Sequence, residues 1–297
     1  MKIKVWGARG SIPAPGPETM RYGGNTSCVE VTLDDGTTLI LDAGTGIRNL
    51  GLVLPRVERP IHILLTHLHL DHIQGLMFFA PAFRPESEIF IWGPASPDAS
   101  LRDRIGRYIS APLAPVEVRE LPSLVFRDAE PMEWRIGSAR VLAQSVTHRG
   151  PTLGYRIEDG DTTLTYIPDH EPGLGAPIAD LEDDWISGFD LADGASMLIH
   201  DCQYTDDEYP SYIGWGHSPM SDTLAFARRV HAKRLLLFHH DPLHSDAFLD
   251  SFGEEATARW HELGGDPGSV ELAAERREIL LDGEGSPAPA QARVGAT

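Results

Sequence analysis

The sequence predicts an α+β fold, an αββα sandwich in which two packed mixed β-sheets are flanked by helices. The chain has 297 residues, of which 41% are hydrophobic, and this is enough for one domain with a large core. Short apolar runs separated by turn residues predict many strands. Strands followed by helices occur twice along the chain, which favours two sheets with helices outside them.

The first half of the chain consists mainly of expected strands. They cover Lys2 to Trp6, Cys28 to Leu33, Thr37 to Leu41, Ile61 to Thr66 and Glu88 to Trp92. The pair Asp35-Gly36 predicts a hairpin turn between the second and third of them. A short amphipathic helix is expected over Leu101 to Ser110, whereas the proline-punctuated residues 111–135 show no clear pattern.

The second half repeats this organisation. Strands are expected over Ala139 to Ser145, Thr152 to Ile157, Thr162 to Ile167, Ala195 to Ile199 and Arg234 to Phe238. Helices are expected over Ser221 to Val230 and over Asp246 to Leu263. We therefore predict a single domain over residues 1–282, followed by a disordered tail over 283–297 that is rich in Gly, Ala and Pro.

Charge and composition exclude several classes of protein. The chain has 25 Lys and Arg against 44 Asp and Glu, a net charge of −19, and binding of long nucleic acids depends on basic residues. No apolar stretch resembles a signal peptide or a membrane span. Cys28 and Cys202 form no CxxC pair, which suits a reducing compartment. We expect a cytoplasmic protein with no membrane partner.

The strongest chemical signal is the run Thr66-His67-Leu68-His69-Leu70-Asp71-His72, which follows a predicted buried strand. Imidazole and carboxylate groups are suited to zinc, manganese or iron, and the lack of nearby thiolates argues against a structural zinc site. This run cannot fill two coordination spheres, so further ligands are expected at later strand ends. Candidates stand there, each after an apolar run: His148, Asp169 and His239.

With these motifs the sequence resembles the metallo-β-lactamase superfamily, in the phosphodiesterase branch that includes ribonuclease Z and cyclic-phosphate phosphodiesterases. The resemblance extends from about Lys2 to Leu281. It implies two divalent ions, with Zn²⁺ expected and Mn²⁺ or Fe²⁺ as alternatives. The implied ligands are His67, His69 and His148 for the first ion, Asp71, His72 and His239 for the second, and Asp169 as the bridge. Asp42, in the family's DxGxG loop, would orient ligand histidines.

Two later segments resemble motifs of the ribonuclease Z group. His200-Asp201-Cys202-Gln203 is similar to its HEAT-type segment, and Gly216-His217-Ser218 is similar to its HST-type segment. The resemblance implies that His217 is a general acid and that Asp201 holds its tautomer and keeps it protonated longer. These two residues and Asp71 are the expected catalytic residues. Ser218, which precedes Pro219, also fits a simple helix cap.

Additional histidines near the C-terminal motif leave the identity of the last metal ligand undecided. The residues alone allow either His239 or His240 as the last ligand, and similarity to the family favours His239. We expect His240 and His244 to line the site or to face solvent. The role of His170 stays open.

The substrate is expected to be small. Ribonuclease Z grips pre-tRNA with a long basic arm, whereas only residues 149–168 separate His148 from Asp169 here. The opening loops resemble those of small-substrate members and suggest Ser11, Asn25 and Thr26 as substrate contacts, although each residue also fits a simple turn.

The expected function is a dinuclear phosphodiesterase that cleaves a 3′,5′-cyclic nucleotide through attack by a metal-bridging hydroxide. The alternatives are tRNA 3′-processing, phosphoribosyl cyclic-phosphate hydrolysis, and a nucleotide-sensing scaffold with a vestigial site. Glyoxalase-type thioester hydrolysis would leave the His217–Asp201 pair without a purpose. The resemblance further implies a homodimer.

Overall fold

The computed structural model of the protein describes residues 1–55 and 59–282. The tail predicted over 283–297 lies outside the described residues. Among the helices of the described part, none is long and apolar enough to cross a membrane.

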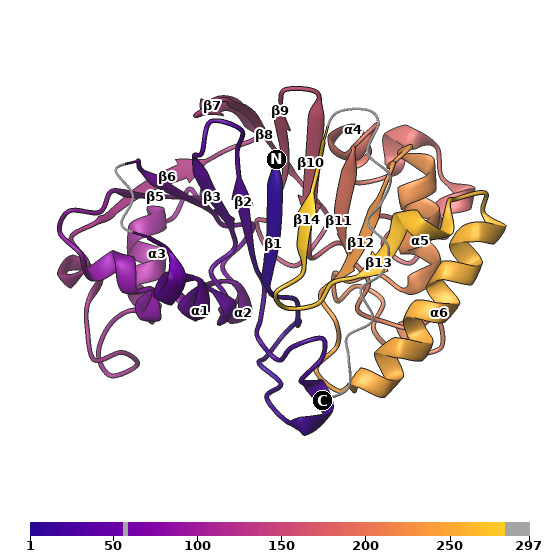
Figure 1. Cartoon of the computed structure of the whole chain (residues 1–297), viewed down its shortest axis with the longest axis horizontal. Coiled ribbons are helices and arrows are strands. Elements are labelled where there is room, and N and C mark those ends of the chain that lie inside the picture. The colour runs from indigo at the N-terminus through magenta and orange to yellow at the C-terminus, as the bar shows by residue number, and fades with distance from the viewer. Residues whose placement is uncertain (56–58, 283–297) are drawn as a thin grey trace.

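Two seven-stranded sheets form the centre of the described molecule (Figure 1). In sheet order, the first contains β14 (Glu278–Leu280), β1 (Lys2–Gly7), β2 (Cys28–Thr32), β3 (Thr38–Leu41), β4 (Ile61–Leu64), β5 (Ile89–Pro94) and β6 (Leu124–Ala129). The second contains β13 (Val270–Leu272), β12 (Leu235–Phe238), β11 (Met197–Asp201), β10 (Thr162–Ile167), β9 (Leu153–Asp159), β8 (Ala139–Ser145) and β7 (Met132–Ile136). Each sheet has antiparallel and parallel pairs and is therefore mixed.

Helices cover the outer faces of both sheets (Figure 1). The first sheet is covered by α1 (Gly46–Val53), α2 (Leu70–Ile73) and α3 (Leu101–Tyr108), and the second by α4 (Phe189–Ala192), α5 (Met220–Arg229) and α6 (Asp246–Glu262). This arrangement confirms the predicted sandwich of two mixed sheets between helical layers.

The core has three parts, as this layering requires. One cluster fills the space between the sheets and includes Val31, Tyr155 and Phe238. The other two lie beneath the helices on either side. The inner strands β3 and β12 are buried along their whole length, and this explains why all their residues except Thr38 are apolar.

Parallel pairing brings the carboxyl ends of β10, β11 and β12 to one level. Ile167 of β10 lies opposite His200 of β11, and Asp201 lies opposite Phe238 of β12. The polar residues that follow these strands therefore meet at one edge of the second sheet. The loop after β4 faces them from the first sheet, because the backbone amide of Leu153 at the start of β9 bonds the carbonyl of Thr66 (2.9 Å).

Candidate metal centre

Asp42 fixes the loop that carries the histidine run. Its backbone has a left-handed φ of 59°, and its buried carboxylate lies under the loop after β4. The carboxylate accepts hydrogen bonds from the backbone amide of Thr66 (2.8 Å) and the hydroxyl of Tyr166 (3.0 Å), and it lies 2.8 Å from Nδ1 of His72. Asp42 thus contacts His72 directly, as expected for a residue that orients ligand histidines.

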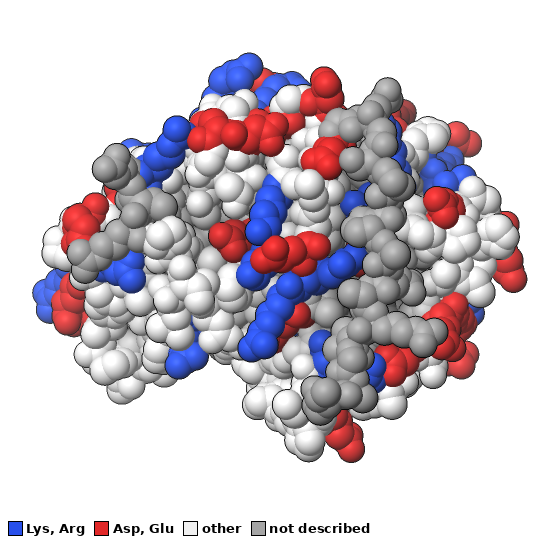
Figure 2. All heavy atoms as spheres, viewed as in Figure 1, with Lys and Arg blue, Asp and Glu red and all other residues white. Residues whose placement is uncertain are grey.

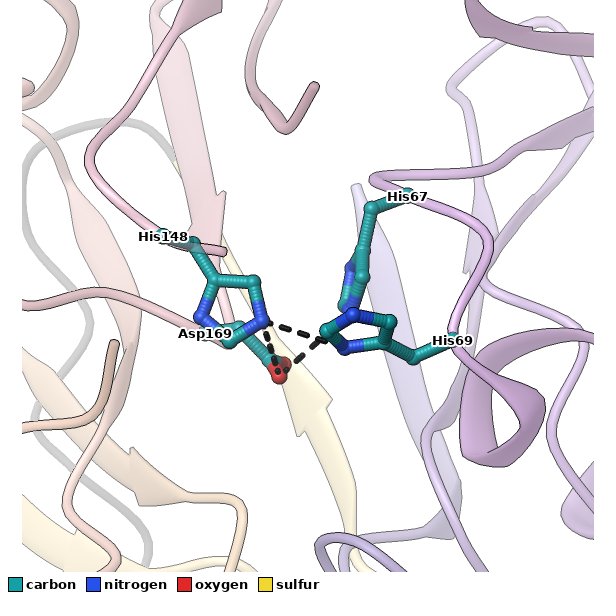
Figure 3. A group of neighbouring side chains, drawn as sticks. All are labelled: His67, His69, His148 and Asp169. Carbon is teal, nitrogen blue, oxygen red and sulfur yellow. Dashed lines mark hydrogen bonds and ion pairs between the residues drawn. The ribbon is translucent and has the colours of Figure 1, made fainter. Parts of the chain in front are cut away.

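The first group of side chains comes from both sheets and consists of His67, His69, His148 and Asp169 (Figure 3). One nitrogen or oxygen atom from each lies within 4.8 Å of all the others. Nε2 of His148 is 3.2 Å from Nδ1 of His69, and Nε2 of His67 is 3.7 Å from Oδ2 of Asp169. These atoms surround one point.

The second group shares Asp169 and adds Asp71, His72 and His239. Nε2 of His72 lies 3.1 Å from Oδ1 of Asp169, and Nε2 of His239 lies 3.3 Å from the same oxygen. Oδ2 of Asp71 is 3.2 Å from both imidazoles. Asp169 thus turns one oxygen toward each group, as a bridging carboxylate would.

The donor set fits two divalent cations. Nε2 of His67, Nε2 of His72 and Oδ1 of Asp169 are buried without a hydrogen-bond partner. Each such atom costs about 1–3 kcal/mol unless something satisfies it, and all three point into these groups. Burial also lowers the pKa of His67 well below its usual value, so that the ring is neutral and can coordinate. Cations that accept N and O ligands would satisfy these atoms.

In four of the histidines Nδ1 has a hydrogen-bond partner in the protein. This contact fixes the ring and leaves Nε2 for a metal. The Nδ1 partners are Asp42 for His72 (2.8 Å), the carbonyl of Gly216 for His148 (2.7 Å), Gln203 for His239 (3.0 Å) and Thr66 for His67 (3.1 Å). Gln203 and Gly216 were not predicted in this role.

The His217–Asp201 pair lies beside the second group. Nδ1 of His217 is 2.7 Å from Oδ2 of Asp201, and the His217 ring stacks on His239 at 4.9 Å. Asp201 is fully buried and also accepts from the amides of Gln203 and Ser218. Burial lowers the pKa of His217. The contact with Asp201 fixes the orientation of the ring.

The suggested substrate contacts have other partners. The amide and side chain of Asn25 bond Glu275, and the hydroxyl of buried Thr26 accepts from the amide of Thr45 (2.9 Å). These two residues hold loops together, and a substrate contact is not supported for them. Ser11 is exposed, and its amide donates to Oδ2 of Asp71 (2.8 Å), so it lies at the site.

The extra histidines are buried and neither line the site nor face solvent. Nε2 of His240 bonds the carbonyl of Ala273, and His244 pairs with Glu208. His170 bonds His200. His239, and not His240, joins the second group.

Ser218 is not a helix cap. Its hydroxyl donates to the carbonyl of His170 (2.6 Å), and α5 begins after Pro219. The serine therefore ties the loop before α5 to the segment that carries Asp169.

Comparisons with known proteins identify the family and the fold. The family model of the beta-lactamase superfamily domain matches residues 37–240. The chain is 28% identical over 269 residues to a ribonuclease Z of Kineococcus radiotolerans, covering 78% of this chain and 82% of that protein.

Two solved structures have a similar fold. The metallo-β-lactamase fold protein YhfI of Bacillus subtilis has a TM-score of 0.67 at 20% identity and covers 94% of this chain and 98% of its own. A diphosphatase of the PhnP family has a TM-score of 0.67 at 16% identity, with coverages of 94% and 96%. The chain therefore belongs to the metallo-β-lactamase superfamily, in its ribonuclease Z-like branch, and is a metal-dependent hydrolase.

Proposed function

We propose that the protein is a dinuclear metal phosphodiesterase whose substrate is a small phosphodiester, preferably a 3′,5′-cyclic nucleotide. The observation that carries this proposal is the pair of ligand groups that share Asp169, with His217 beside them. The relatives named ribonuclease Z support phosphodiester chemistry.

The proposed ligands are those of the two groups. His67, His69 and His148 would hold one ion, Asp71, His72 and His239 the other, and Asp169 both. When bound, the ions supply Lewis acidity, which lowers the pKa of water and neutralises charge on phosphoryl oxygens. We propose zinc, because imidazole and carboxylate ligands suit it; manganese and iron accept the same ligands.

His217 is the proposed general acid, with Nε2 as its acting atom because Nδ1 faces Asp201. Asp201 accepts a hydrogen bond from Nδ1–H and stabilises the imidazolium form of the ring, whose Nε2–H can be given to a leaving alkoxide. The His217 ring stacks on His239, a ligand of the second group, which supports this role. An alkoxide is a poor leaving group, so protonation at this position promotes cleavage of a sugar–phosphate bond.

Two features favour a small substrate over a long nucleic acid. Strands β9 and β10 occupy most of the segment between His148 and Asp169. They form a tight hairpin in which Asp159 pairs with Thr162, so the segment has no room for an RNA-binding arm. On the described part of the face in Figure 2, Lys and Arg side chains alternate with Asp and Glu and form no extended basic surface. The net charge of −19 adds repulsion for a polyanion.

A tRNA 3′-processing activity is the second candidate, since the relatives named ribonuclease Z share this family. A hydrolase of phosphoribosyl cyclic phosphates would share the metal ligands and would differ in the sugar pocket. A homodimer and a single domain over residues 1–282 belong to the same proposal.

A substrate panel tests the proposal. Metal-loaded protein is offered 2′,3′- and 3′,5′-cyclic nucleotides, a phosphoribosyl cyclic phosphate and pre-tRNA. We expect the highest kcat/KM for a 3′,5′-cyclic nucleotide. Cleavage of pre-tRNA without turnover of cyclic nucleotides would replace our choice, and an Asp71→Ala variant that loses metal yet keeps its cellular effect would indicate a sensing scaffold.

A further inference from the structure

A row of aromatic side chains runs from the proposed general acid to the protein surface. The Tyr204 ring lies 6.0 Å from His217, and Tyr212 stacks on Tyr204 at 4.6 Å with an interplanar angle of 7°. Trp215 meets Tyr212 edge-on at 5.7 Å. Tyr204 is buried, whereas Tyr212 is 36% and Trp215 52% exposed. The outer end of the row is therefore open to a ligand.

Arg149 joins the outer end of this row from the other side of the site. It follows the ligand His148 directly, and its guanidinium carbon lies 5.4 Å from the centre of the Trp215 ring. Its Nε donates to the carbonyl of Gly214 (2.9 Å). Within the part of the chain that the structure describes, Arg149 is exposed and has no carboxylate partner. Its charge is therefore available to an anion.

Glu171 holds the loop that carries Trp215. This carboxylate is 1% exposed and accepts hydrogen bonds from the Tyr209 hydroxyl and the amides of Gly214 and Gly216, each at 2.8 Å. The carbonyl of Gly216 in turn accepts from His148. Trp215 is thus exposed on a loop tied to the metal ligands. An indole fixed in this way next to a polar site is suited to binding a flat ring.

We propose that Trp215 and Arg149 form a subsite for the base of a nucleotide, and this rests on the proposed function. The leaving oxygen must lie at His217 to receive a proton, so the remainder of the leaving group extends along the aromatic row. In a 3′,5′-cyclic nucleotide that oxygen belongs to the sugar that carries the base. The base stacks on Trp215, and Arg149 attracts the phosphate toward the site.

Two substrates, one with a nucleoside and one without, test this subsite in the metal-loaded protein. They are 3′,5′-cyclic AMP and 1,3-propanediol cyclic phosphate, which has the same six-membered phosphodiester ring without sugar or base. We expect Trp215→Ala to raise KM for cyclic AMP about 5- to 150-fold, the range of one base–aromatic stack. KM for the propanediol ester should stay unchanged, and Trp215→Phe should retain most of the affinity for cyclic AMP.

Equal changes in KM for both substrates, or no change for either, would overturn the subsite. A change in oligomeric state without a change in KM would instead identify Trp215 as a subunit contact, which also overturns it. If wild-type protein turns over neither substrate, the preference for a 3′,5′-cyclic nucleotide in the proposed function fails. Calorimetric titration with AMP then still tests the subsite, because AMP binding that Trp215→Ala abolishes supports it and binding that is insensitive to this change overturns it.

Discussion

Gly216→Ala should detach one metal ligand while the fold stays intact. A Cβ atom at Gly216 would lie 2.3 Å from Nδ1 of His148, whereas ordinary contacts begin near 3.4 Å. The imidazole must therefore move by about 1 Å, more than the roughly 0.5 Å that a metal ligand tolerates. We expect a loss of about 10- to 100-fold in metal affinity at the first group.

Gly214→Ala is the matched control for this change. Gly214 has a φ of +81°, close to the +90° of Gly216, but a Cβ there meets no atom within 4 Å. Both amides donate to Glu171 and survive the substitution. Each variant should lose a similar stability, about 1–2 kcal/mol, from left-handed backbone strain. Only Gly216→Ala should lose metal in competition with a chelator. Equal metal retention in both variants would refute the positioning of His148 by Gly216.

Three further predictions concern other parts of the molecule. Gln203→Met removes the acceptor behind His239, so bound metal should fall from two ions per chain toward one; a full complement by elemental analysis would contradict this. His217→Ala should lower kcat about 10²- to 10⁴-fold for cyclic nucleotides but little for bis(p-nitrophenyl) phosphate, whose leaving group needs no proton; equal losses would argue against a general acid. Burial raises the pKa of Asp222 to about 6 from 3.8, so the folded state binds the proton more tightly and loses stability as pH rises through 6. Asp222→Asn should raise the free energy of unfolding by about 1–2 kcal/mol at pH 7.5 and not at pH 3.5, measured by thermal unfolding. A gain at both pH values would show that burial of the Asp222 charge is not the cause.

The inner strands and the predicted ligands could be found from sequence because they follow one rule. A buried strand such as β12 is an unbroken apolar run, and the polar residue directly after it, His239, lies at the sheet edge. The strands β6 and β7 were missed within residues 111–135 because their side chains are largely half-buried or exposed, and prolines interrupt the pattern. The three-residue strands β13 and β14 are too short to give a pattern and depend on their partners β12 and β1.

Other parts of the site depend on contacts that no local pattern encodes. Gln203 and Glu171 hold His239 and the Gly216 loop across long stretches of chain, and neither stands in a motif that indicates its partner. The polar run around Asn25 and Thr26 looked suited to a phosphate, but their side chains bond Glu275 and Thr45. Helix α1 was missed because two of its eight residues, Gly46 and Gly51, are glycines with low helix propensity.

Metal titration tests the central claim most directly. Metal-free protein receives increasing Zn²⁺ or Mn²⁺, and the hydrolysis of bis(p-nitrophenyl) phosphate is recorded at each step. The shared carboxylate of Asp169 between two ligand groups predicts activity that rises to a plateau at two ions per chain. A plateau at one ion would contradict the dinuclear site, and no hydrolysis at any metal concentration would contradict the phosphodiesterase itself.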